Sequence, residues 1–254
     1  MNLENLIDDL KSTALRAGEL ELKHYNEGTA IMRKDDGSPV TLADQEAEDL
    51  ILKDLKSLTP DIPIVAEEAV AAGNIPDISG GTFWLVDPLD GTKEFVRRTG
   101  EFTVNIALMQ NFKPVLGVIY APVVDELYVG YGPDTAERTI KGEAKKISVR
   151  IVPEEGYTVV ASRSHSNKDE LQDYLQGKKI ADQAFRGSSL KICQVAAGDA
   201  DLYPRLAPTC EWDIAAGHAI VNAAGGKMTK LDGSDLEYGK VNDNFLNPFF
   251  VVQA

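Results

Sequence analysis

Two carboxylates and a hydroxyl follow one apolar segment of the chain at close spacing. Asp87, Asp90 and Thr92 lie directly after residues 82–86, which carry no charge and are typical of a strand covered on both faces. Pro88 is expected to end this strand because it has no N–H to donate to the ladder. Carboxylates this close repel each other unless a cation or a proton lies between them, and such oxygen ligands favour Mg²⁺, Mn²⁺ or Ca²⁺. An ordinary Asp-rich turn is the alternative interpretation.

Three further carboxylate positions have a similar character. Glu67 and Glu68 come directly after the short apolar segment 64–66, and Asp213 falls in the first turn of a predicted helix. Asp44 follows Thr41 by three residues at the start of another predicted helix, which is the spacing of a capping box. Two of these positions also have a plain structural interpretation: a solvated loop for the Glu pair and a helix cap for Asp44.

The elements that must position these groups change in kind near residue 150. The first half is predicted to contain two amphipathic helices followed by strands in an antiparallel meander, and the second half alternates strands with helices. The predicted helices are 3–25, 42–58, 168–176, 190–197 and 212–224. The predicted strands are 64–66, 82–86, 102–109, 114–120, 126–131, 145–152, 158–162, 184–185, 200–203 and 249–252. We therefore expect an α/β protein with two tightly packed lobes, 1–150 carrying most of the carboxylates and 151–254 carrying Asp213.

Composition narrows the class of protein. The 254 residues are 43% hydrophobic and 26% charged, as in an ordinary globular protein, and no apolar run approaches the length of a membrane span. The net charge of −14 argues against binding of nucleic acid through a basic face, but an anionic small molecule can be held by metals and a few placed cations. The polar N-terminus does not resemble a secretory signal, and two cysteines, Cys193 and Cys210, form no disulfide framework, so we expect a cytoplasmic protein.

Taken together, three segments resemble the inositol monophosphatase superfamily of lithium-sensitive, Mg²⁺-dependent phosphatases. They are Glu67-Glu68 after a strand, Asp87-Pro-Leu-Asp-Gly-Thr92, and Trp212-Asp213-x-Ala-Ala-Gly217 at a helix start. Further segments resemble the bisphosphate nucleotidases of this superfamily that are called CysQ-type: Asp-Gly-Thr-Lys-Glu-Phe, Gly100-Glu-Phe-Thr-Val-Asn-Ile-Ala107, Ala161-Ser-Arg-Ser-His165, Gly187-Ser-Ser-Leu-Lys191 and Asp201-Leu-Tyr-Pro-Arg205. The resemblance spans nearly the whole chain and implies a layered αβαβα sandwich with the metals between two lobes.

The resemblance implies a metal site and a base. The implied metal ligands are Glu67, Asp87, Asp90, Asp213 and the carbonyl oxygen of Leu89. They would hold two Mg²⁺ ions, with Mn²⁺ able to substitute and Li⁺ inhibitory, and a third ion would bind near Asp90 or residues 34–36. A metal-activated water would then attack the phosphate, oriented by Glu67 and Thr92, with Asp44 accepting a hydrogen bond from the threonine. On this resemblance a functional role for Asp44 outweighs the capping role.

The resemblance also implies a substrate. It is adenosine 3′,5′-bisphosphate (PAP), hydrolysed to AMP and phosphate in sulfur metabolism, with the sulfated nucleotide PAPS as a further substrate. The implied contacts to the reacting phosphate are Glu67, Leu89, Asp90, Gly91, Thr92 and Asp213, and those to the remainder of the nucleotide are His165, Ser188, Lys191 and Arg205. Lys191 and Arg205 suit a second phosphate, which needs charge-assisted donors. Neither a nucleic-acid partner nor a transmembrane segment is expected, and the resemblance leaves open a monomer or a homodimer and peripheral association with the inner membrane.

Other functions share part of this pattern. An inositol or sugar-phosphate phosphatase would use the same metal site, so fructose 1,6-bisphosphate and inositol phosphates remain alternative substrates. A phosphatase with a nucleophilic Asp has one residue between its two carboxylates, whereas two residues lie between Asp87 and Asp90. A calcium loop of the EF-hand kind starting at Asp87 would need an acidic twelfth residue, and that residue is Arg98.

Overall fold

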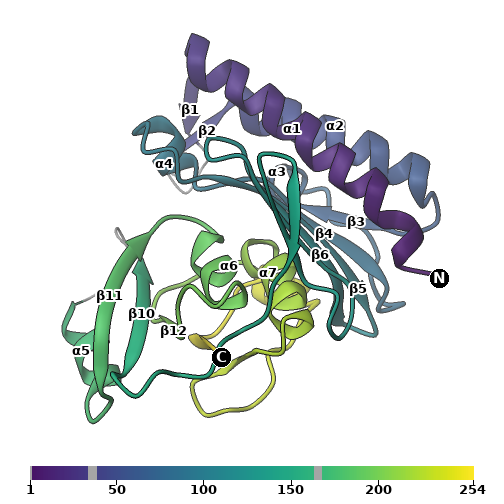
Figure 1. Ribbon diagram of the computed structural model, residues 1–254. Coiled ribbons are helices and arrows are strands. Elements are labelled where there is room, and N and C mark those ends of the chain that lie inside the picture. Colours follow the sequence, from purple (N-terminus) through teal and green to yellow (C-terminus); the bar gives the residue numbers. More distant parts are fainter. Residues whose placement is uncertain (1, 34–38, 163–167) are drawn as a thin grey trace.

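A computed structural model describes residues 2–33, 39–162 and 168–254. Five layers follow one another: two helices, a seven-stranded sheet, two helices, a five-stranded sheet and one helix (Figure 1). The predicted αβαβα sandwich is therefore confirmed. The helices of eight or more residues are α1 (Ile7–Glu27), α2 (Leu42–Leu58), α5 (Lys168–Leu175) and α7 (Glu211–Ala223). The shorter helices are α3 (Glu67–Ala71), α4 (Thr92–Val96), α6 (Leu190–Ala196) and the 3-10 turns η1 (Glu4–Leu6) and η2 (Val241–Asp243).

The first large sheet has the strand order β3-β4-β5-β6-β7-β8-β9. Its strands are β3 (Ile64–Ala66), β4 (Phe83–Asp90), β5 (Thr103–Gln110), β6 (Lys113–Ala121), β7 (Glu126–Gly130), β8 (Glu137–Ile140) and β9 (Glu143–Lys146). β3 and β4 are parallel, and all the other neighbours are antiparallel, as predicted for the meander. Because β3 and β4 run in the same direction, Glu67 and Asp90 emerge at the same edge of the sheet.

The second large sheet has the order β11-β10-β12-β14-β13. Its strands are β10 (Tyr157–Ser162), β11 (Ile180–Arg186), β12 (Leu202–Arg205), β13 (Lys227–Lys230) and β14 (Phe250–Gln253), and a separate hairpin pairs β1 (Ile31–Arg33) with β2 (Pro39–Thr41). The two large sheets lie on either side of residue 150, where the lobe boundary was predicted, and that boundary stays a prediction.

The strand that carries the central motif differs from its prediction. β4 does not end at Pro88 but continues to Asp90, and the pairing with β5 shifts between Asp87↔Asn105 and Asp90↔Thr103. The shift inserts one extra residue into β4, which is a bulge that accommodates the proline without an N–H. The bulge changes the direction of the last residues of β4. Asp87, before the bulge, is buried, and Asp90, the last residue of the strand, is partly exposed.

Some predicted strand boundaries were wrong. The predicted strand 145–152 overlaps β9 only at residues 145–146, and β9 pairs with a strand β8 that the sequence did not reveal. β8 and β9 carry mostly charged residues because they form an exposed edge of the sheet, so no hydrophobic pattern marks them. β13 was also missed, and Glu67 and Glu68 open the short helix α3 and do not lie in a loop.

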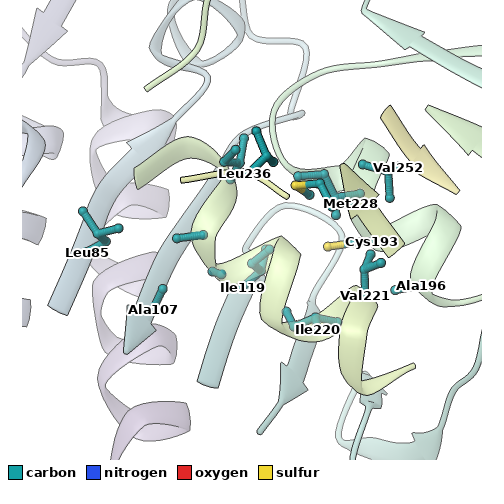
Figure 2. Close-up of a cluster of buried hydrophobic side chains, with 14 of the residues drawn as sticks. Leu85, Ala107, Ile119, Cys193, Ala196, Ile220, Val221, Met228, Leu236 and Val252 are labelled. Carbon is teal, nitrogen blue, oxygen red and sulfur yellow. The ribbon is translucent and has the colours of Figure 1, made fainter. Parts of the chain in front are cut away.

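The middle helix layer joins the two sheets through the largest core. In Figure 2, Leu85, Ala107 and Ile119 of the first sheet face Cys193 of α6 and Ile220 of α7. Gly117 in β6 allows this close approach, since a Cβ there would lie 2.1 Å from the carbonyl oxygen of Ala216. α7 is therefore held directly against the sheet that carries β4, which brings the start of α7 to the exit of β4.

Smaller cores lie on the outer faces of the two sheets. Leu10 and Ala14 of α1 and Ile51 of α2 pack on the outer face of the first sheet, and Leu171 and Leu175 of α5 pack on the second. In the part of the chain that the structure describes, no helix is both long enough and apolar enough to cross a membrane.

Candidate active site

One pocket of about 370 Å³ collects most of the predicted site residues. Its volume falls in the range of small-molecule sites. The predicted residues that line it are Glu67, Asp90, Gly91, Thr92, Ser188, Lys191, Arg205 and Asp213. They come from the end of β4 and the segments that follow β3 and β4 in the first sheet, from the end of β12 in the second sheet, from the start of α7 and from the segment that precedes and opens α6. Of the remaining predicted residues, Asp44, Asp87 and Leu89 are buried, and His165 and residues 34–36 lie outside the described residues.

Thr92 and Asp44 form a direct hydrogen bond. The Thr92 hydroxyl donates to Oδ1 of Asp44 at 3.0 Å, and it lies 3.3 Å from the carbonyl oxygen of Leu89. The other Asp44 oxygen, Oδ2, accepts from the backbone N–H and the hydroxyl of Thr41 at 2.8 and 2.7 Å. Burial raises the pKa of Asp44, although the three donors oppose that change. A carboxylate with a raised pKa is a better proton acceptor, so the pair is suited to take a proton through the threonine.

The turn after β4 places Gly91 and Thr92 in the wall of the same pocket. Gly91 has φ +98°, a conformation that side chains rarely adopt, and it precedes Thr92 at the start of α4. A Cβ at this position would lie 3.0 Å from the carbonyl oxygen of Glu101. Gly91 therefore serves the tight turn that delivers Thr92, as the sequence predicted.

The other carboxylates of the motif are fixed by local donors. Asp87 accepts a hydrogen bond from the backbone N–H of Leu89 at 3.0 Å, and Asp213 accepts from the N–H of Cys210 at 2.9 Å in a capping box of α7. Asp90 lies 2.9 Å from the Ser189 hydroxyl. Burial raises the pKa of both Asp90 and Asp213, and repulsion by the carboxylates of Asp90 and Glu67 raises the pKa of Asp213 further.

The repulsion between these carboxylates indicates whether a cation fits the site. Burial next to like charges makes ionised carboxylates costly, and oxygen donors of this type are those that hard divalent cations bind. Within residues 2–33, 39–162 and 168–254, however, no three carboxylate, imidazole or thiolate groups are close enough to form one metal site. The donor chemistry and the shared pocket fit divalent cations, while the predicted coordination of Glu67, Asp87, Leu89, Asp90 and Asp213 stays a prediction.

A residue that sequence reasoning missed supports Glu67. The buried carboxylate of Glu48 in α2 accepts hydrogen bonds from the backbone N–H groups of Glu68 and Ala69, both at 2.8 Å. It thereby anchors the first turn of α3, where Glu67 lies. Burial raises the pKa of Glu48 to about 7. Its spacing of four from Asp44 places both acids on one face of α2, which is the signal that could have identified it.

The two predicted phosphate-binding cations differ in their surroundings. Lys191 is 4% exposed, and its ammonium donates to the carbonyl oxygens of Arg186 and Ser188. Burial lowers the pKa of Lys191 to about 8, although the attraction of Asp90 opposes this change. Arg205 is partly exposed, and its guanidinium donates to the carbonyls of Ala207 and Pro208 at 3.1 and 2.9 Å. Both contribute positive charge to the pocket wall, and Arg205 is the more accessible of the two.

Comparison with known proteins gives consistent matches. The model of the inositol monophosphatase family matches residues 2–248. The chain is 45% identical to a 3′(2′),5′-bisphosphate nucleotidase CysQ of Salmonella typhimurium strain LT2, over 97% of this chain and 99% of the relative. It is 44% identical to the protein of that name from Escherichia coli strain K12, with the same coverage of both chains.

Solved structures agree with the sequence matches. The crystal structure of CysQ from Bacteroides thetaiotaomicron, a bacterial member of the inositol monophosphatase family, has a TM-score of 0.83 at 37% identity and covers 100% of this chain and 98% of that one. An inositol monophosphatase from Anabaena (Nostoc) sp. PCC 7120 has a TM-score of 0.78 at 26% identity, with coverage of 100% and 92%. Both the sequence identity and the TM-score are higher for the CysQ structure than for this inositol monophosphatase, which favours the nucleotidases.

Proposed function

The chain belongs to the inositol monophosphatase family, and we propose that it is a CysQ-type 3′(2′),5′-bisphosphate nucleotidase that removes the 3′-phosphate of PAP. The products are AMP and phosphate, and PAPS is a further substrate of the same site. The observation that carries this proposal is the hydrogen bond from Thr92 to Asp44, made in a pocket that Glu67, Asp90 and Asp213 also line. That arrangement supplies a proton acceptor in a pocket that is also lined by carboxylates, as hydrolysis of a phosphate ester by water requires.

Thr92 and Asp44 move the proton. Since the Thr92 hydroxyl donates to Asp44 Oδ1, its oxygen lone pairs remain available to accept a proton from the attacking water. As that proton arrives at Thr92 Oγ, the threonine proton passes to Asp44 Oδ1. Glu67, held at the start of α3 by Glu48, orients the water from the other side.

Phosphatases of this family depend on metal ions. Here Glu67, Asp87, Asp90, Asp213 and the Leu89 carbonyl would hold two Mg²⁺ ions, with Mn²⁺ as a substitute and Li⁺ as an inhibitor. When bound, these ions would lower the pKa of a water molecule and balance the charge of the phosphate. Asp90 and Asp213, two partly buried carboxylates with raised pKa values, support this assignment because a cation relieves their repulsion.

The opposite wall of the pocket recognises the remainder of the nucleotide. Arg205 and Lys191 provide charge for the second phosphate, and Pro208 and Leu246 add apolar surface against which a base can pack. Leu246 is 47% exposed, so its side chain is accessible from the pocket that it lines. The enzyme would act in sulfur metabolism in the cytoplasm.

The test compares two substrates under two metal conditions. Release of phosphate is measured from PAP and from inositol 1-phosphate, each with Mg²⁺ and with Mg²⁺ plus Li⁺. We expect strong preference for PAP and loss of its hydrolysis with Li⁺. Preference for inositol 1-phosphate would preserve the metal chemistry but overturn the nucleotidase assignment, and no turnover of either substrate would overturn both.

A further inference from the structure

A single buried hydroxyl joins the two segments that carry Asp90 and Asp213. Ser189 is 2% exposed, and its Oγ lies 2.9 Å from Oδ2 of Asp90 and 2.7 Å from the backbone carbonyl oxygen of Asp213. Asp90 ends β4 in the first sheet, and Asp213 lies in the first turn of α7. Ser189 itself precedes α6, so one side chain connects three elements at the point where the pocket is most acidic.

Two further buried groups fix the orientation of this hydroxyl. Asn105 of β5 donates from Nδ2 to Ser189 Oγ at 2.9 Å, and the Oδ1 of Asn105 accepts from the Thr103 hydroxyl at 3.0 Å. Asn105 is 1% exposed and Thr103 is fully buried. Because Asn105 donates to an oxygen lone pair, the single proton of Ser189 is directed toward Asp90 and Asp213.

The Ser189 side chain makes these contacts and does not cap α6. Ser189 occupies the N-cap position of α6, where a serine commonly accepts a hydrogen bond from the backbone of the helix it starts, yet its side chain makes no capping bond. Its hydrogen bonds go to residues 84, 99 and 24 positions away in the chain. A hydroxyl diverted in this way serves the tertiary arrangement of the site and not the local helix.

We propose that Ser189 is a positioning residue for the metal site, which holds the Asp90 carboxylate and the first turn of α7 at the spacing that divalent cations require. The inference rests on the proposed function, since it takes Asp90 and Asp213 to be metal ligands. Asn105 and Thr103 act through Ser189 by fixing its hydroxyl. The hydroxyl does not touch the substrate in this role, so its loss weakens metal binding before it affects anything else.

The test measures metal binding directly. Wild-type protein, Ser189→Ala and Ser189→Thr are freed of metal and titrated with Mn²⁺ alone by calorimetry, without substrate. Residues that orient metal ligands affect metal affinity by about 10-fold to 100-fold, so we expect Ser189→Ala to bind Mn²⁺ at least about tenfold more weakly. Ser189→Thr keeps the hydroxyl and should retain most of the affinity. In activity assays, excess Mg²⁺ should restore most of the kcat of Ser189→Ala and leave the KM for PAP nearly unchanged.

Thr13→Ala is a matched control for the loss of a buried hydroxyl. Thr13 is 4% exposed and donates to Oδ2 of Asp54 at 2.7 Å, between α1 and α2 and outside the pocket. Both alanine variants should unfold at a lower temperature in EDTA than the wild type, but only Ser189→Ala should lose Mn²⁺ affinity. Thr103→Val removes the outer hydroxyl of the chain of hydrogen bonds, together with its 3.3 Å contact to Ser188 Oγ. It should show a smaller loss of Mn²⁺ affinity in the absence of substrate, and it serves as the probe if Ser189→Ala does not fold.

Two negative results have different meanings. If the wild type binds Mn²⁺ and hydrolyses PAP while the Ser189 and Thr103 variants bind Mn²⁺ as tightly as it does, Ser189 is a packing residue and only this inference is overturned. If the wild type neither binds Mn²⁺ nor hydrolyses PAP, the proposed function itself is overturned, and the assignment of Ser189 falls with it.

Discussion

Asp44 divides its two carboxylate oxygens between the fold and the site. Oδ2 closes the capping box of α2 with Thr41, and Oδ1 accepts the hydrogen bond from Thr92 at 3.0 Å. The capping interpretation of Asp44 is therefore confirmed, while its functional role stays a prediction, for which the bond to Thr92 is the required geometry. The helix start fixes the carboxylate, and the fixed carboxylate then orients the threonine that faces the pocket.

Replacement of Asp44 by asparagine should separate these two roles. Asp44→Asn keeps an oxygen for the cap but cannot take up the proton, so we expect kcat for PAP to fall by about 10²–10⁴-fold, the usual range for a positioned base, with little change in KM. Steady-state kinetics at saturating Mg²⁺ would measure both constants. Thr41→Ala is the opposite control: it removes the cap at a cost of about 1 kcal/mol in unfolding free energy, and most of kcat should remain. A kcat for Asp44→Asn close to that of wild type would exclude the proton transfer.

Replacement of Asp213 by asparagine should stabilise the metal-free protein and inactivate the enzyme. The pKa of Asp213 is raised in the folded state, so its ionisation at neutral pH opposes folding, and a neutral amide removes that cost. We expect the melting temperature in EDTA to rise by several degrees, since about 1 kcal/mol corresponds to 2–4 °C in a chain of this size. Excess Mg²⁺ should raise the melting temperature of the wild type but not of Asp213→Asn. Asp61→Asn, an exposed change, should shift neither value, and an unstable but metal-responsive Asp213→Asn would contradict the assignment.

The stability of the protein should depend on pH through Glu21. This carboxyl in α1 is fully buried, its pKa is well above the usual value because of burial and the nearby Asp44, and among the described residues neither of its oxygens has a hydrogen-bond partner. A raised pKa means that the folded state keeps the proton that the unfolded state releases above about pH 4.3. Stability is therefore lost as pH rises above that value.

Glu21→Gln removes this titration and should show it in thermal unfolding. The gain in melting temperature over wild type should be small near pH 4.5 and should grow steadily toward about pH 8. Glu19→Gln, on the exposed side of the same helix, is the matched control and should change little at either pH. A gain that is independent of pH would show that the Glu21 carboxyl does not titrate in this range.

Arg205 should distinguish a nucleotide with two phosphates from one with a single phosphate. A hydrogen bond to a charged group contributes about 1.5–3 kcal/mol, so Arg205→Ala should lower kcat/KM for PAP by about 10-fold to 100-fold. The same variant should change kcat/KM for 3′-AMP little, because that substrate lacks the 5′-phosphate. Arg205→Lys keeps the charge and should retain part of the activity on PAP. Equal losses on both substrates would mean that Arg205 acts through the turn it holds at Ala207 and Pro208.

The signals that the sequence carried reliably are local ones. The capping box involves Thr41 and Asp44, which are three residues apart in the sequence. α2 begins and ends where the pattern predicted. The motif from Asp87 to Thr92 indicated the site because its charges directly follow an apolar strand. The short strand β8 was missed because none of its residues is fully buried, so no buried face imposes a hydrophobic pattern on it.

What the tertiary structure decided is which distant residues meet. The bulge that carries β4 past Pro88 depends on the neighbouring strand β5, and the contacts of Glu48 with the start of α3 and of Ser189 with Asp90 join residues 20 and 99 positions apart. Sequence alone determined the fold class, the family and the residues of the central motif, because these follow from patterns along the chain. The partners that hold those residues in place could not be read from it, since a hydrogen bond between segments exists only after packing has brought both ends within about 3 Å.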